Sequence, residues 1–113
     1  MAVRTSTLDG GIGLIEVRGD LIGGTETDKL RQAITGFIER DYKKLVIDLS
    51  KVTYINSTGI GVLVAGYTSF SRKDGQIRLC GLNNNVTNVF VITKLTLVFE
   101  VCDTRAEAVK GLS

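Results

Sequence analysis

The chain has 113 residues, of which 43% are hydrophobic and 23% charged, and its formal net charge is +2. This length suits one domain around one core, and the composition is typical of a globular rather than a disordered protein. The basic residues occur at most in pairs, such as Lys43-Lys44, whereas nonspecific binding of nucleic acid needs many phosphate contacts. We therefore expect a single domain over residues 1–113 that does not bind nucleic acid.

The sequence contains no apolar run near the roughly 18 residues that a membrane-spanning helix requires. Its first residues also lack the charged and then apolar layout of a signal peptide. We therefore expect a cytoplasmic protein without a membrane partner.

Catalytic and cofactor-binding patterns are missing from the sequence. The chain has no histidine, which excludes Ser-His-Asp and Cys-His catalysis, and it has no P-loop motif. Its two cysteines, Cys80 and Cys102, give no recognisable zinc site; both lie in apolar runs and are expected to be buried free thiols, although a disulfide stays open. The carboxylates are scattered along the chain. We therefore expect a protein that is not an enzyme and that needs no cofactor or metal.

Two strands are predicted at the start of the chain, over residues 3–8 and 12–18. Asp9-Gly10-Gly11 between them is a turn signal, so the two strands are expected to form an antiparallel hairpin. Residues 19–24 are expected to form a loop.

An amphipathic helix is predicted to begin after this loop, capped by Thr25 with Asp28 three residues on. Apolar residues then recur at helical spacing: Leu30, Ala33, Ile34, Phe37 and Ile38. The nearly continuous apolar run over residues 44–49 is typical of a central strand covered on both faces, and its apolar character extends to Ile55.

Residues 57–72 are predicted to be helical, because Ile60, Leu63, Val64 and Tyr67 have helical spacing. Gly59, Gly61 and Gly66 oppose this, at about 1 kcal/mol each relative to alanine. Their presence requires a reason, and the usual one is close approach of another backbone or a ligand.

The second half of the chain begins with a turn over residues 73–75 and a strand over residues 76–81. Residues 83–101 are ambiguous: residues 86–92 have strand-like composition, but Val86, Val89 and Phe90 also fit one face of a short helix capped by Asn84 or Asn85. A last strand is predicted over residues 97–101. Asp103 is expected to cap a final helix. The predicted order is ββαβαβαβα, an α/β fold with a mixed, mainly parallel sheet and crossover helices.

One segment carries a candidate functional site, because a buried strand is followed by a short loop and then by Ser57-Thr58 at a predicted helix start. A helix N-terminus presents unpaired N–H groups and the positive end of the helix dipole, which together favour a phosphate. The alternative is that Ser57 serves only as an N-cap.

The stretch from Asp48 to Leu63 resembles the signature of STAS domains, specifically those of bacterial anti-sigma factor antagonists. The usual pattern is D-L-S-x-V-x-x-[IM]-D-S-[ST]-G-[LI]-G-x-L, and the sequence matches each specified position except the aspartate, which is Asn56. Gly19-Asp20-Leu21 also resembles the G-[DE]-[LI] turn of the family. The resemblance covers nearly the whole chain in element order and length, and it implies a short helix over residues 84–93.

The resemblance implies a switch at Ser57. In that family, an anti-sigma factor that is also a serine kinase phosphorylates this serine, a serine phosphatase reverses the modification, and only the unmodified antagonist binds the anti-sigma factor and frees a sigma factor for transcription. The partner-binding residues would be Asp20, Leu21, Ile22, Asn56, Thr58, Gly59, Ile60 and Gly61. A phosphate adds about −1.5 to −2 charges at pH 7, so we expect it to block docking rather than to unfold the domain.

Asn56 and Ile22 depart from the family pattern, since both remove an aspartate close to the proposed phosphate. Asparagine can still cap a helix but cannot offer a carboxylate to a kinase or to a partner arginine. A constitutive STAS scaffold or transporter-associated subunit is therefore an alternative. A nucleotide-binding site at the Ser57 helix end is a third hypothesis. A phospho-aspartate receiver at Asp48 is disfavoured, because the first strand lacks the acidic pair that holds magnesium.

Overall fold

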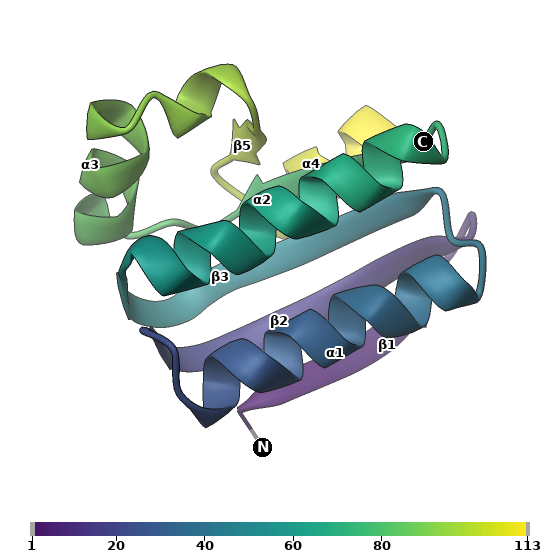
Figure 1. The fold of residues 1–113 in the computed structure, drawn as a ribbon. Coiled ribbons are helices and arrows are strands. Elements are labelled where there is room, and N and C mark those ends of the chain that lie inside the picture. Colours follow the sequence, from purple (N-terminus) through teal and green to yellow (C-terminus); the bar gives the residue numbers. More distant parts are fainter. Residues whose placement is uncertain (1, 113) are drawn as a thin grey trace.

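A five-stranded sheet with four α-helices forms the structure, a computed structural model that describes residues 2–112 (Figure 1). Met1 and Ser113, the two ends of the expected domain, lie outside the described residues. The predicted order ββαβαβαβα is confirmed. The elements are β1 (Val3–Leu8), β2 (Ile12–Leu21), α1 (Thr25–Glu39), β3 (Lys44–Ile55), α2 (Ser57–Arg72), β4 (Gln76–Cys80), α3 (Asn84–Ile92), the 3-10 helix η1 (Leu95–Leu97), β5 (Glu100–Cys102) and α4 (Arg105–Leu112).

The strands lie in the sheet in their chain order, β1-β2-β3-β4-β5. β1 and β2 pair antiparallel through the predicted hairpin, whose Gly10 and Gly11 have φ of +82° and +73°, a conformation that favours glycine. The other pairs are parallel, and helical segments connect them. α1 and α2 therefore lie side by side on one face of the sheet (Figure 1).

Alternating side chains of the strands supply a core on each face of the sheet. Leu45, Ile47 and Leu49 of β3 join the larger cluster, which includes buried residues of α1, α2 and α3. Val46 points to the opposite face, where the smaller cluster includes Ala108 of α4. This two-sided burial explains the nearly continuous apolar run of β3.

The caps of three helices differ from the predictions. Gly24 rather than Thr25 precedes α1, where no side chain caps the helix, although the buried Thr27 accepts a hydrogen bond from the Gly23 N–H at 3.0 Å. Asn83, not Asn84 or Asn85, caps α3.

At the last helix, Oγ1 of Thr104, not Asp103, accepts from the Glu107 N–H at 3.2 Å. Each of the three caps lies one or two residues from the predicted one, and at α3 and α4 a neighbouring residue of similar type takes the capping role.

Two segments extend differently from the predictions. β2 continues to Leu21, so residues 19–21 are strand with irregular pairing to β3, and only residues 22–24 of the predicted loop lie outside a strand or helix. The predicted last strand is present, but its bounds differ from the predicted 97–101: Leu95–Leu97 forms η1, and the strand is Glu100–Cys102. Leu95 and Phe99 are buried while Leu97 between them is exposed, which excludes a strand here, because alternate residues of a strand share one face.

The ambiguous residues before that strand form α3, as the family resemblance implied. Val86 and Phe90, four residues apart, are its buried side chains. Over residues 2–112, no helix combines the length and the apolar character needed to cross a membrane.

Candidate functional site at the start of helix α2

Ser57 is the first residue of α2, and its side chain is exposed. The cap of this helix is Asn56, whose Oδ1 accepts from the N–H groups of Thr58 at 3.0 Å and Gly59 at 3.2 Å. The hypothesis that Ser57 is only an N-cap is therefore wrong. The hydroxyl lies at the positive end of the helix without taking part in the cap.

The end of β2 lies against this helix start. The backbone N–H of Asn56 donates to the Leu21 carbonyl at 3.1 Å, and the Asn56 side-chain Nδ2 donates to the Ile22 carbonyl at 3.2 Å. Asn56 thus uses both ends of its amide, one for the helix and one for the neighbouring loop. An aspartate at this position could cap the helix, but it has no N–H for the Ile22 carbonyl.

Gly59 makes the close approach of these two segments possible. A Cβ added at Gly59 would overlap the Leu21 carbonyl oxygen and lie 2.8 Å from the Leu21 Cβ, which real Cβ atoms do not do. The predicted reason for this glycine, close approach of another backbone, is confirmed. Gly61 differs, because a Cβ there would meet nothing within 4 Å.

The predicted partner-binding residues separate into exposed and buried groups. Leu21 and Gly59 are buried, so they cannot contact a partner directly and instead join β2 to α2; their assignment to the docking surface is corrected on this ground. Ile60 is half-buried and packs against the larger core. The exposed residues are Asp20, Ile22, Asn56, Thr58 and Gly61, together with Ser57.

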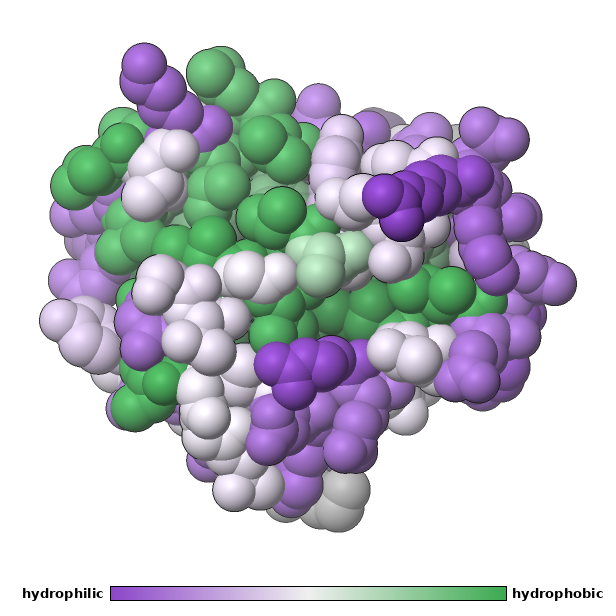
Figure 2. Space-filling view, viewed as in Figure 1, coloured by the Kyte–Doolittle hydropathy of each residue, from purple (hydrophilic) through white to green (hydrophobic). Residues whose placement is uncertain are grey.

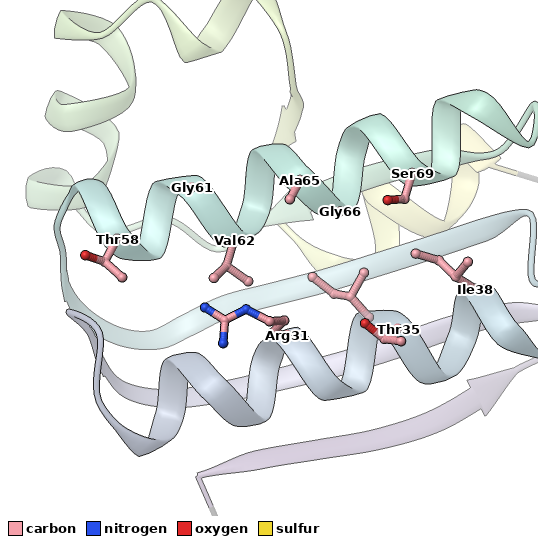
Figure 3. A pocket seen from close by; sticks show the side chains of 10 residues that line it. Arg31, Thr35, Ile38, Thr58, Gly61, Val62, Ala65, Gly66 and Ser69 are labelled. Carbon is pink, nitrogen blue, oxygen red and sulfur yellow. The ribbon is translucent and has the colours of Figure 1, made fainter.

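A groove of about 310 Å³ runs between α1 and α2 and begins beside this helix start. Thr58 and Gly61 line its near end, and the Arg31 side chain extends along the groove from α1 toward this end (Figure 3). Figure 2 shows an apolar stripe between the two helices, bordered by polar side chains. Arg31 carries the positive charge of this groove and pairs with the exposed Asp28 at 2.8 Å.

This groove could not be predicted from the sequence, because its lining residues come from two separate helices, α1 and α2. The spacing of residues along the sequence leaves both partner surface and core packing open for Val62 and Ala65. Ala65 is exposed, whereas Val62 is buried at the floor of the groove.

A second polar cluster lies under α4, and sequence reasoning missed it. Arg105 donates from Nη2 to Asp48 Oδ2 at 2.8 Å and to Glu16 Oε2 at 2.9 Å, so these two carboxylates are grouped and not scattered. Burial raises the pKa of Asp48, but hydrogen bonds from Ser50 and Arg105 outweigh it and hold this pKa below its ordinary value. Asp48 is therefore a buried carboxylate paired with Arg105, which does not suit the role of a phosphate acceptor.

Substitutions of Asn56 test how the helix start is held. Asn56→Ala removes the cap and the bond to the Ile22 carbonyl, so we expect the free energy of unfolding to fall by about 1–2 kcal/mol. Asn56→Asp keeps the cap and adds a charge that suits the helix dipole, so it should cost less than half as much. Urea unfolding of both variants measures this, and equal losses would contradict the assignment of the cap.

The sequence matches the STAS domain family over residues 5–108. The chain therefore belongs to the STAS domain family. It is 30% identical over 79 residues to the anti-sigma-B factor antagonist of Listeria monocytogenes, which covers 70% of this chain and 69% of that protein.

Solved structures share the fold over nearly the whole chain. A Thermotoga maritima protein with a provisional description as an anti-sigma factor antagonist has a TM-score of 0.90 at 23% identity, covering 97% of this chain and 93% of that one. The phosphorylated form of the Bacillus cell fate determinant SpoIIAA has a TM-score of 0.77 at 16% identity, covering 99% and 100%. At these identities, the two structures establish the fold alone.

Proposed function

We propose that this protein is an anti-sigma factor antagonist that docks through the start of α2. The observation that carries the proposal is the exposed Ser57 at the first position of α2, in a family whose curated relatives include anti-sigma factor antagonists. The docking surface consists of Ile22, Asn56, Ser57, Thr58 and Gly61, with Asp20 at its border. In this role the chain is a regulatory binding module and not an enzyme.

The proposed switch is phosphorylation of Ser57 by the anti-sigma factor acting as a serine kinase, with a serine phosphatase reversing it. The phosphate would sit at the positive end of α2, so the helix itself tolerates the charge. Asn56 supplies the cap independently of the Ser57 hydroxyl, so modification leaves the cap in place. A partner surface closed over Ser57 would have to desolvate the new charge, and docking is lost without refolding.

Two variants of Ser57 test this proposal against the anti-sigma factor kinase of the same organism. We expect Ser57→Ala to bind with wild-type affinity and to accept no phosphate. Ser57→Asp should bind at least about tenfold more weakly, because desolvating its charge needs to cost only about 1.4 kcal/mol to lower the affinity tenfold. Calorimetry measures the affinities, and intact mass after incubation with ATP measures the modification.

Ser6→Asp serves as the matched control, because Ser6 is exposed on β1 and pairs with Leu14, well before the Leu21 end of β2 where the proposed docking surface lies. Its affinity should equal that of the wild type. The proposal fails if Ser57→Asp and Ser57→Ala bind equally well, or if Ser6→Asp weakens binding as much as Ser57→Asp does.

A second candidate function is constitutive binding as a STAS scaffold, and Asn56 favours it. This side chain replaces the aspartate of the family pattern with an amide that bonds the Ile22 carbonyl, so no carboxylate stands beside Ser57 in the loop. A partner that binds tightly while the kinase leaves Ser57 unmodified would establish this function in place of the switch.

A further inference from the structure

The two cysteines of the chain lie opposite each other on neighbouring strands. Cys80 ends β4, Cys102 ends β5, and the two residues are direct partners in the parallel register. Partnered residues point to the same face of a sheet. Here that face is covered by α4, and Cys102 packs against the cluster that contains Cys80, Ala108 and Leu112.

The strand spacing suits a covalent link between these thiols. Neighbouring strands lie about 4.8 Å apart, and the Cα atoms of disulfide-bonded cysteines are about 4.4–6.8 Å apart. Both cysteines are free in the structure. We propose that Cys80 and Cys102 form an oxidation site at which a peroxide converts the pair into a reversible disulfide between β4 and β5.

The different exposure of the two thiols sets the order of the steps. Cys80 is 1% exposed, and its pKa is raised to about 12. Burial is the larger cause, and the negative charge of the nearby Asp48 carboxylate is the second. Cys102 is half-buried and is the sulfur that meets the oxidant. The Cys102 sulfur attacks one peroxide oxygen, the O–O bond breaks, and the thiol becomes a sulfenic acid with release of one water.

Cys80 acts in the second step as the resolving thiol. Its sulfur attacks the Cys102 sulfur, the S–O bond breaks, and the hydroxyl leaves as a second water with the proton of Cys80. Two thiols and one hydrogen peroxide thus give one disulfide and two waters. Because the Cys80 thiolate is scarce, this step is expected to be slow, over minutes to hours.

The link would fasten the most weakly paired strand of the sheet. β5 has three residues, lies at the edge and pairs with β4 alone. Residues 81–101, which include α3 and η1, would become a closed loop with less freedom in the unfolded chain. This segment carries most of the exposed large apolar side chains of the described residues: Val91, Ile92, Leu97, Val98 and Val101. Figure 2 shows an apolar area over α3 and the chain that follows it.

Hydrogen peroxide treatment of the full chain tests the proposal, with dithiothreitol as the reversing agent. We expect the protein to lose the mass of two hydrogens and to yield one crosslinked peptide pair, containing Cys80 and Cys102, that dithiothreitol separates. The Tm should rise by roughly 5–10 °C, and dithiothreitol should abolish this rise. Amide exchange in residues 95–102 should slow in the oxidised form.

Single variants supply the controls. Cys102→Ser should show no mass loss and no Tm shift, whereas Cys80→Ala should retain a sulfenic acid on Cys102 that dimedone traps. If Cys80→Ala does not fold, Cys102→Ser alone carries the comparison. Two free thiols after treatment, a sulfinic acid on Cys102 without a crosslink, or a lowered Tm would each overturn the proposal.

Discussion

Gly59→Ala is expected to destabilise the protein by about 2 kcal/mol, although alanine is the better helix former by about 1 kcal/mol. The added methyl would overlap the carbonyl oxygen of Leu21, and neither backbone can yield without moving β2 away from α2. Because the hydrogen bond from the Asn56 N–H to that same carbonyl would be strained, the start of α2 should also shift. Urea unfolding measures the loss, and amide exchange at Asn56 locates it.

Gly61→Ala is the matched control, two residues along the same helix. A methyl at Gly61 meets nothing within 4 Å, so this variant should gain about 0.5–1 kcal/mol from helix propensity alone. The two substitutions therefore change the free energy of unfolding in opposite directions. A loss of stability in both variants would show that glycine is required along α2 for a reason other than the contact with Leu21.

The sequence alone indicated that glycines in α2 allow a close approach, but it did not distinguish the role of Gly59 from that of Gly61. Helical spacing of apolar residues predicted α2, and the glycines within it signalled a close approach. Which glycine makes the approach depends on how far β2 extends, and the prediction ended that strand at Arg18 although it continues to Leu21. The error arose because Gly19 and Asp20 are poor strand formers, while pairing with β3 overrides their preference.

Arg105→Met is expected to lower the free energy of unfolding at pH 7 by about 2 kcal/mol, because the Asp48 carboxylate, which is 8% exposed, loses its cationic partner. The loss should be smaller than for a fully enclosed pair, since the Arg105 side chain is 41% exposed. Chemical denaturation at constant ionic strength measures it.

The same cluster predicts a dependence on pH with a definite sign. The pKa of Asp48 in the folded protein lies below its ordinary value of 3.8, so its contribution is present above that value and is lost as the pH falls through the folded pKa. We expect the wild type to lose stability between about pH 4 and about pH 2, and Asp48→Asn, already weaker at pH 7, to lose less over this interval. Parallel curves for the two proteins would contradict this assignment.

Glu16→Gln separates the buried carboxylate from its exposed neighbour. Glu16 contacts the same guanidinium at 2.9 Å, but its side chain is 37% exposed. Its replacement should cost about 0.5 kcal/mol, as is typical of a solvated ion pair. A loss as large as that of Arg105→Met would place the main anchor on Glu16 instead of Asp48.

This cluster could not be found from the sequence, in contrast to the helix start at Ser57. Ser57 follows its strand directly, so local patterns suffice to place it. Asp48 and Arg105 are separated by 57 positions, and their contact depends on α4 packing against the face of the sheet opposite α1 and α2. The choice among neighbouring cap residues was equally inaccessible, because several suitable side chains stand next to one another and tertiary packing selects one.

Main-chain contacts hold β2 against α2, and they are possible because Gly59 has no side chain. The side chains of Ile22, Ser57 and Thr58 are exposed at this junction. If these side chains form the docking surface as proposed, recognition and architecture are divided between different atoms. Exchanging the three outward side chains should then change partner preference without lowering thermal stability, which makes this junction a starting point for engineering orthogonal regulatory pairs.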